Sequence, residues 1–224
     1  MRGYAICGER RSESNHLCDL LASTGVLGKP AEYFCAEAMR DSIPGYPADP
    51  EEQLSCISSV GATPNGIYGV KLHCVEFDQV QATRWAERLP DLSFVFLERR
   101  DVLAQAISYV RACQTDQWRS TGQARAEPSY DPAAINRALI GTLSNLNRWR
   151  YYLMRNGISY LHLFYEDVVD APQGTVEAVG RLVGLDETPR IDASRLRLKM
   201  QRDALSEDWR KRFVAEMRDL SQFH

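Results

Sequence analysis

The sequence lacks several features that mark whole classes of protein. Its 224 residues carry 27 lysines and arginines against 30 aspartates and glutamates, so no excess charge of either sign attracts nucleic acid. No apolar stretch approaches the roughly 20 residues of a membrane-spanning helix, and no repeat or low-complexity tract occurs. We therefore expect no nucleic-acid partner and no membrane span. Any anion that binds must be held by a local cluster of cationic and N–H groups.

Disulfide and metal patterns are also missing. The six cysteines show no Cys-x-x-Cys spacing, and the four histidines show no spacing typical of metal ligands. Several cysteines lie inside apolar runs, where a free thiol behaves as a small hydrophobic group. The N-terminal residues do not resemble a signal peptide. These features predict reduced cysteines, no metal and a cytoplasmic location.

The composition, 44% hydrophobic and 25% charged, is typical of a globular protein, and we expect a single domain over residues 1–224. Four short apolar runs, each closed by a charged or glycine-containing turn, predict strands buried on both faces. They cover residues 4–7, 66–72, 93–97 and 158–164. Helical periodicity covers residues 14–24, 78–88, 101–114, 133–156, 172–184 and 206–221. Asp101 fits an N-cap, and Pro132 fits a first helical turn.

This alternation predicts an α/β fold, with a central parallel β-sheet flanked by helices and a helical annex at about 115–156. A proline- and glycine-rich stretch at about 40–66 predicts an excursion with one short helix. A second polar segment, 120–131, predicts a mobile loop near the mouth of an active site. We expect segments 40–60 and 115–131 to line a pocket for the acceptor substrate.

A polar turn at residues 8–16 joins the first predicted strand to an amphipathic helix. A strand, a tight turn and a helix N-terminus direct backbone N–H groups and the positive end of the helix dipole to one point, which suits phosphate or sulfate. Ser12, Ser14 and Asn15 add side-chain donors, and Arg11 adds a bidentate cation. A solvated turn with a serine cap is the alternative. The Gly-Lys-Ser/Thr ending of a nucleoside-triphosphate loop is missing, which disfavours a kinase or phosphotransferase.

Further segments strengthen the anion-binding interpretation. In order along the chain, residues 11–15, 24–34, 63–72, 99–108 and 111–115 resemble the bacterial sulfotransferases of the trehalose 2-sulfotransferase family. The resemblance ends near residues 206–209, and its specificity lies in the ordered set. Residues 164–167 also resemble a strand end in the wider sulfotransferase superfamily. The resemblance implies a P-loop-like sulfotransferase fold, the donor 3′-phosphoadenosine 5′-phosphosulfate (PAPS), and a homodimer.

The resemblance also implies a map of the donor site. The family's 5′-phosphosulfate contacts correspond to Arg11, Ser12, Ser14 and Asn15. Its contacts to the 3′-phosphate correspond to Arg99, which closes a predicted strand, and to Ser108 on the following helix. Where the family usually has a glycine in the first turn, this chain has Glu13, whose carboxylate would face an anionic donor unless it turns away or pairs with a neighbouring arginine. Because of this departure, a non-catalytic protein that binds the nucleotide stays an alternative.

Three side chains are candidates for the general base that sulfuryl transfer to a hydroxyl uses. The resemblance points first to Glu32, which is otherwise a first-turn glutamate. His73 is second, because Lys71-Leu72-His73 resembles the Lys-x-His of animal cytosolic sulfotransferases, in which the lysine assists the sulfuryl group. His16 is third.

The acceptor site is defined least clearly. Arg111, Gln114 and Trp118 follow the predicted donor helix at helical spacing, and Tyr33 is next to Glu32. Aromatic rings with hydrogen-bonding groups suit a sugar and equally suit the edge of a core. Together with the resemblance, they favour a PAPS-dependent sulfotransferase that acts on a carbohydrate or glycolipid.

Overall fold

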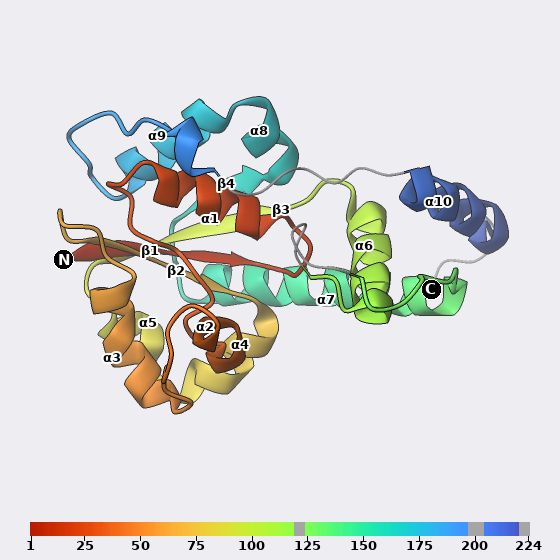
Figure 1. Ribbon diagram of the computed structural model, residues 1–224, viewed down its shortest axis with the longest axis horizontal. Helices are drawn as coiled ribbons and strands as arrows, with labels where there is room; N and C mark the ends of the chain where they lie inside the picture. The colour runs from red at the N-terminus through yellow and green to blue at the C-terminus, as the bar shows by residue number, and fades with distance from the viewer. Residues whose placement is uncertain (119–123, 197–203, 220–224) are drawn as a thin grey trace. The chain divides into compact units, whose positions relative to one another are not determined.

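The computed structural model describes residues 1–118, 124–196 and 204–219 (Figure 1). The chain divides into two compact units. The sheet unit contains residues 1–100 and 146–196, and the helical unit contains the described residues of 101–145 and 204–219. The single domain over 1–224 stays a prediction. The helical unit overlaps the expected annex only from 115 to 145, because helices before and after that segment complete its core.

The sheet unit is built on four parallel strands in the order β2-β1-β3-β4. The strands are β1 (Arg2–Gly8), β2 (Ile67–Leu72), β3 (Leu92–Glu98) and β4 (Tyr160–Phe164). This arrangement confirms the predicted central parallel sheet. Because all strands run in one direction, the segments that follow them leave from the same edge, where ligands of open α/β sheets bind.

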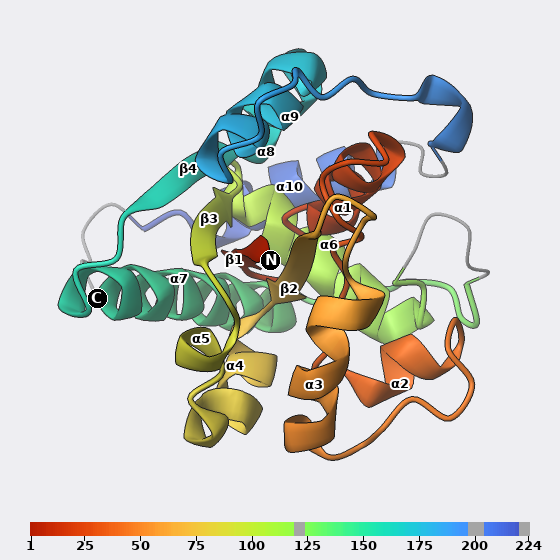
Figure 2. The ribbon, with the colours of Figure 1, turned by 90° about the vertical axis from the view of Figure 1, so that its left-hand side faces the viewer.

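Helices cover both faces of this sheet, with α1, α8 and α9 on one face and α3, α4 and α5 on the other (Figures 1 and 2). The helices that lie wholly in the sheet unit are α1 (Ser14–Ser23), α2 (Ala36–Arg40), α3 (Pro50–Val60), α4 (Cys74–Val80), α5 (Trp85–Arg88), α8 (Tyr165–Asp170) and α9 (Pro172–Leu182). Two short 3-10 helices, Gln81–Thr83 and Ala193–Arg195, also belong to it. The long helix α7 (Pro132–Arg155) begins in the helical unit and ends in the sheet unit.

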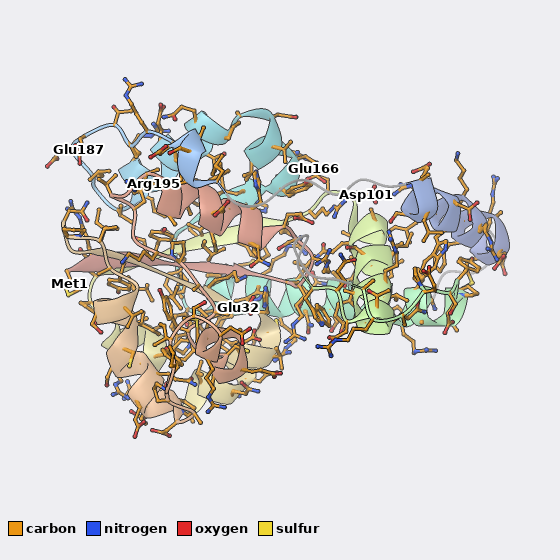
Figure 3. All side chains as sticks on the ribbon, in the orientation of Figure 1. Met1, Glu32, Asp101, Glu166, Glu187 and Arg195 are labelled. Atoms are coloured by element: carbon orange, nitrogen blue, oxygen red, sulfur yellow. The ribbon has the colours of Figure 1, made fainter. Side chains whose placement is uncertain are left out.

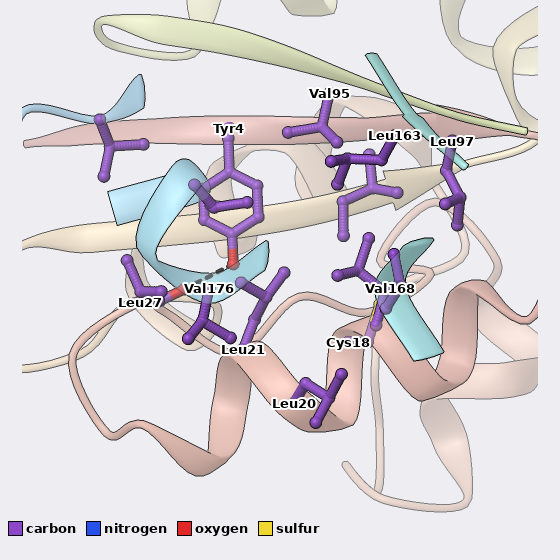
Figure 4. Close-up of a cluster of buried hydrophobic side chains, with 14 of the residues drawn as sticks. Tyr4, Cys18, Leu20, Leu21, Leu27, Val95, Leu97, Leu163, Val168 and Val176 are labelled. Carbon is purple, nitrogen blue, oxygen red and sulfur yellow. Dashed lines mark hydrogen bonds between the residues drawn. The ribbon is translucent and has the colours of Figure 1, made fainter. Parts of the chain in front are cut away.

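Apolar side chains fill both faces of the sheet. On the α1 and α9 face, Leu21 and Val176 pack around Tyr4, whose hydroxyl donates to the Leu27 carbonyl at 2.5 Å (Figure 4). On the opposite face, the rings of Phe77 and Trp149 meet edge to face at 5.1 Å. These layers explain why β1, β2 and most of β3 are buried.

The fourth strand differs from the prediction of burial on both faces. β4 lies at the edge of the sheet, and four of its five residues are only partly buried or exposed. The imidazole of His162 is 38% exposed and contacts the buried carboxylate of Glu98 at 2.6 Å. The other edge strand, β2, is buried throughout and also bonds to the segment before α2, through the Lys71 N–H and the Ala31 carbonyl. Position at an edge therefore permits the exposure seen in β4 but does not require it.

Two helical predictions need correction. The helix expected at 78–88 begins earlier, at Cys74, and is interrupted by Arg84 in the left-handed conformation (φ 55°). The excursion at 40–66 was expected to hold one short helix, but α2 ends in it and α3 lies wholly within it. Asp49 accepts from the Glu52 N–H at 3.2 Å and so starts α3. Of the predicted loop 120–131, residues 120–123 lie outside the described part, and 124–131 form no helix or strand.

The helical unit has its own core. It is formed by α6 (Val102–Thr115), the first part of α7, and α10 (Ala204–Met217). Their buried side chains are Ile107, Val110, Ile135, Trp209 and Phe213. Asp101 caps α6 by accepting from the Ala104 N–H at 3.0 Å, and α7 begins at Pro132, so both predicted start signals are confirmed.

The six cysteines are free thiols, as expected. Burial raises the pKa of Cys18 to about 11 and that of Cys74 to about 12, which keeps these thiols protonated and unreactive at neutral pH. Within the described residues, no helix is both long enough and apolar enough to cross a membrane, and no cluster of potential ligands could hold a metal ion.

Candidate functional site

The polar turn between β1 and α1 lies at the carboxyl edge of the sheet. It begins where β1 and β3 approach closely, since a Cβ on Gly8 would lie 2.7 Å from the Leu97 carbonyl oxygen. Arg11 and Glu13 both adopt left-handed backbone angles, with φ of 62° and 60°. The turn then enters α1, whose first N–H groups have no partner within the helix. These groups and the helix dipole make the turn a suitable place for an anion.

Ser12 and Arg99 each have a buried polar atom near this edge without a hydrogen-bond partner among the described residues. The Ser12 side chain is fully buried, and its Oγ makes no hydrogen bond to any described residue. The same holds for Nε of Arg99, which follows β3 and whose guanidinium lies 5.2 Å from the Tyr165 ring centroid. An unsatisfied buried donor costs about 1–3 kcal/mol. An anionic group bound at each of these donors would satisfy it.

Lys71 is the buried cation of the site. Its side chain is 3% exposed, and its Nζ lies 2.6 Å from Glu32 Oε1 and 2.6 Å from Asn15 Oδ1. The ammonium thus joins the end of β2 to the first turn of α1 and to the segment before α2. Three residues singled out in the sequence, far apart along the chain, meet in one cluster.

Backbone contacts to β2 fix the position of Glu32. Gly28 has φ +74°, and a Cβ there would lie 2.8 Å from the Gly69 nitrogen, so the glycine permits close approach to the strand. The Lys71 N–H then donates to the Ala31 carbonyl at 2.9 Å. Glu32 lies close to α2 and α4, with a quarter of its side chain exposed (Figure 3).

The charge state of Glu32 follows from its neighbours. Burial raises the pKa of Glu32, but Lys71 and His73 outweigh burial and hold the pKa below its usual value. Glu32 is therefore ionised at neutral pH and can accept a proton. Its partial exposure leaves room for another molecule to reach it.

His73, the second candidate base, lies beside Glu32. Its Nδ1 is 3.9 Å from Glu32 Oε1 and 3.3 Å from Glu76 Oε2. The imidazole is only 5% exposed, and neither ring nitrogen makes a hydrogen bond to a described residue. Another molecule can therefore reach the Glu32 carboxylate more easily than the His73 imidazole. His16, the third candidate, lies in α1, and its backbone N–H donates to the Glu13 carbonyl at 2.9 Å.

Glu13 occupies the N-cap position of α1 without a side-chain cap bond. Its left-handed backbone is costly for a residue with a Cβ, by about 1–2 kcal/mol, and is nearly free for glycine. Arg10, one of the two arginines that precede Glu13, places its guanidinium 3.3 Å from Glu76. The glycine usual at this position in the resembling family thus has a conformational reason.

We expect Glu13→Gly to raise the melting temperature by roughly 2–4 °C, because it relieves about 1 kcal/mol of backbone strain. Glu13→Ala is the matched control, since it removes the carboxylate but keeps the Cβ and its strain. Differential scanning calorimetry of both variants measures the effect. Equal melting temperatures for glycine and alanine would show that the backbone at residue 13 is not strained.

The predicted acceptor residues have other contacts. Tyr33 is 2% exposed, and its hydroxyl donates to the Lys29 carbonyl at 2.6 Å, so it supports the Glu32 segment from inside. In the helical unit, Arg111 donates to Ser206 Oγ at 2.5 Å, and Gln114 exchanges hydrogen bonds with the Ser129 backbone. Trp118 lies beyond α6, as expected, because α6 ends at Thr115 and Asp116 adopts a left-handed backbone.

The remaining predicted donor residues are placed in both units. Ser14 is buried in the first turn of α1, and Arg11 is partly buried in the turn before it. Ser108 lies half-buried on α6 in the helical unit. A shared 3′-phosphate for Arg99 and Ser108 stays a prediction.

Sequence reasoning did not assign Glu76 and Tyr165 to the site. Glu76 lies three residues after His73, a spacing typical of a helix N-terminus whose third residue reaches back to the cap, and this signal could have identified it. Tyr165 lies in the segment after β4 that resembles the sulfotransferase superfamily, and its ring packs against Arg99. The next arginine, Arg100, forms a two-bond ion pair with Asp167 of that segment at 2.8 and 2.6 Å.

Comparisons with known proteins identify the family of the chain. Two proteins named trehalose 2-sulfotransferase, from Mycobacterium tuberculosis and Mycolicibacterium smegmatis, are 27% and 26% identical to the chain, over 96% and 94% of it and 96% and 93% of their own lengths. The crystal structure of a sulfotransferase from Alicyclobacillus acidocaldarius superposes with a TM-score of 0.52 at 16% identity, covering 99% of this chain and 98% of that one, which confirms the predicted fold class. The sequence profile described as Stf0 sulphotransferase matches residues 3–216. The chain therefore belongs to the Stf0 sulphotransferase family.

Proposed function

We propose that this protein transfers a sulfuryl group from PAPS to a hydroxyl of a carbohydrate or glycolipid. The observation that carries the proposal is the cluster at the carboxyl edge of the sheet, where Lys71 holds Glu32 and Asn15 within 2.6 Å beside the anion-binding turn. Family membership supports the sulfotransferase activity, and the names of the two mycobacterial relatives support a sugar acceptor. Trehalose itself is not carried over to this chain.

The residues of the sheet unit fit the donor. Backbone N–H groups of the turn, with Ser12 and Arg11, would hold the phosphosulfate, and the unpartnered Nε of Arg99 would face the 3′-phosphate. When bound, PAPS supplies the sulfuryl group and leaves as adenosine 3′,5′-bisphosphate. Lys71 would neutralise negative charge that develops beside it, which is the main task of a protein in such displacements.

Glu32 would act as the general base. Its carboxylate is ionised, partly exposed and fixed by Lys71, so it can take the proton of an acceptor hydroxyl as the oxygen attacks sulfur. Asn15 holds the ammonium from the other side and thereby fixes the direction of the pair. Proton acceptance by Glu32 weakens its attraction to Lys71, which leaves the lysine charge available to the departing phosphate.

A non-catalytic nucleotide-binding protein is the second candidate, because Glu13 places a carboxyl-bearing residue in the turn. It would bind the nucleotide without turnover. A phosphotransferase is disfavoured by the missing Gly-Lys-Ser/Thr ending.

Thermal-shift measurements with adenosine 3′,5′-bisphosphate, AMP and ATP test the proposal. At a hundred times its Kd, the bisphosphate should stabilise the protein by about 2.7 kcal/mol and raise its melting temperature by roughly 5–10 °C. AMP, which lacks the 3′-phosphate, should give a much smaller shift, and ATP should give no larger one than AMP. No shift with millimolar bisphosphate would refute the donor assignment. A shift without sulfuryl transfer to any sugar tested would favour the non-catalytic alternative.

A further inference from the structure

Glu76 is a buried carboxylate to which neither the family resemblance nor the proposed mechanism gives a role. It lies in the first turn of α4 and is 2% exposed. Its Oε2 accepts from the His73 backbone N–H at 2.9 Å and lies 3.3 Å from Nδ1 of the same residue. Its Oε1 lies 3.3 Å from the guanidinium of Arg10. Both oxygens of one carboxylate are therefore engaged, each with a different part of the site.

These contacts connect the anion-binding turn with the two candidate bases. Arg10 belongs to the anion-binding turn, and its backbone N–H is held by Glu9 Oε1 at 2.8 Å. His73 continues the chain of contacts in the other direction, since its Nδ1 is 3.9 Å from Glu32 Oε1. Glu76 is thus the only described carboxylate within 4 Å of both the Arg10 guanidinium and the His73 ring.

The surroundings of His73 determine how its ring is oriented. Nδ1 lies 3.3 Å from one oxygen of Glu76 and 3.9 Å from one of Glu32. Two carboxylates on this side of the ring favour the tautomer with its proton on Nδ1, because they would repel a lone pair there. Burial raises the pKa of Glu76, but the contacts with His73 and Arg10 outweigh burial and lower the pKa to about 2. Glu76 therefore keeps its negative charge across the physiological range and attracts a proton on Nδ1, the ring nitrogen on the side of Glu32.

A helix cap alone would not need this arrangement. Capping at the third helical residue requires one side-chain oxygen for the N–H of the cap residue. Here the second oxygen binds a cation from another strand end, and the capping oxygen also faces an imidazole.

We propose that Glu76 is a positioning residue that couples the donor turn to the base. Through Oε1 it orders Arg10 and the turn, and through Oε2 it fixes the His73 ring that faces Glu32. The coupling role rests on the proposed function, whereas the orientation of His73 does not. Both candidate bases named from the sequence then belong to one unit, in which Glu32 accepts the proton and His73 holds Glu32 in its ionised form.

Three variants separate the two contacts kinetically. Arg10→Gln breaks the link to the turn and should weaken binding of adenosine 3′,5′-bisphosphate, measured by calorimetry, about two- to fivefold with little change in kcat. His73→Phe breaks the link to the base and should lower kcat roughly three- to thirtyfold with unchanged Kd. Glu76→Gln keeps the shape and an acceptor for the His73 N–H, yet should change both quantities. Glu87→Gln, at an exposed position of α5, is the control and should change neither.

A role limited to capping α4 predicts a different result. Glu76→Gln would then lower the melting temperature while kcat and Kd, measured well below it, stay at their wild-type values. That outcome, or an effect on only one of the two quantities, would overturn the coupling.

A spectroscopic measurement separates this inference from the proposed function. The protein has four histidines, and the ring signals of His73 in nitrogen-15 NMR are assigned by their loss in His73→Phe. The wild-type spectrum should show a protonated Nδ1. Glu76→Gln should shift this signal, and Glu87→Gln should not.

An unprotonated Nδ1, or an unchanged signal in Glu76→Gln, would refute the orientation of His73 even if the enzyme is active. Conversely, a protein that neither binds the bisphosphate nor transfers sulfate, but shows the predicted shift, would refute only the proposed function and the coupling that rests on it.

Discussion

Replacing Glu32 with glutamine should lower turnover by roughly 10²- to 10⁴-fold, the contribution of a general base, while binding of adenosine 3′,5′-bisphosphate changes little. Glutamine has nearly the same shape but cannot take a proton from the acceptor hydroxyl. Its amide oxygen can still accept from Lys71, which preserves the position of the side chain. The measurement is steady-state sulfuryl transfer with saturating donor, together with calorimetric binding of the bisphosphate.

The same substitution tests the buried ion pair. Lys71 loses the charge that compensates it, and a buried cation without its partner is costly. We therefore expect a lower melting temperature as well as lower turnover, and kinetics should be measured well below it. Glu37→Gln is the matched control, because Glu37 is an exposed glutamate five residues further along. It should leave both quantities unchanged.

Turnover of Glu32→Gln distinguishes the two candidate bases. If Glu32→Gln turns over at nearly the wild-type rate, Glu32 is not the base, and His73 takes its place. In that case His73→Phe should abolish turnover instead of lowering it three- to thirtyfold. Should Glu32→Gln fail to fold, Glu32→Asp keeps the charge next to Lys71 and shortens the side chain by one methylene. A loss of turnover in Glu32→Asp, at unchanged affinity for the bisphosphate, would then identify Glu32 as the base.

The sheet and its site-bearing edge were predictable because their signals are local. Each strand is a short apolar run, and the turn after β1 carries its donors within residues 11–15. Lys71 and Glu32 were identified through the resemblance, but their 2.6 Å contact was not. That contact depends on how Gly28 packs against Gly69, a tertiary arrangement that composition and periodicity do not encode.

The network around Glu76 could not be derived for a related reason. Its position three residues after His73 signals a helix start, but nothing local indicates that Arg10, 66 residues earlier, reaches the same carboxylate. The end of α6 was predicted to within one residue, since the expected helix over 101–114 ends next to Thr115. Helical spacing does not place Trp118, however, because the left-handed backbone of Asp116 is not visible in a hydrophobic pattern.

Replacing Arg99 with alanine should weaken binding of adenosine 3′,5′-bisphosphate by about 2–3 kcal/mol, or roughly 30- to 150-fold in Kd. Arg99 follows β3, its guanidinium packs against Tyr165, and its Nε is buried without a hydrogen-bond partner among the described residues. The Nε–H is already out of contact with water, so this donor loses little further hydration when a phosphate arrives, and much of the charge-assisted bond appears as affinity.

The ligand series isolates the phosphate that Arg99 contacts. Affinity for AMP, which lacks the 3′-phosphate, should be nearly the same in Arg99→Ala and wild type, so the difference between the two ligands should collapse in the variant. Arg88→Ala is the control, since Arg88 is an exposed arginine of the same unit that pairs with Glu51. Equal losses for AMP and the bisphosphate would move Arg99 to the 5′ end of the donor. Unchanged affinity for the bisphosphate would remove Arg99 from the donor site, because a buried, unpartnered guanidinium nitrogen that contacts phosphate cannot be deleted without cost.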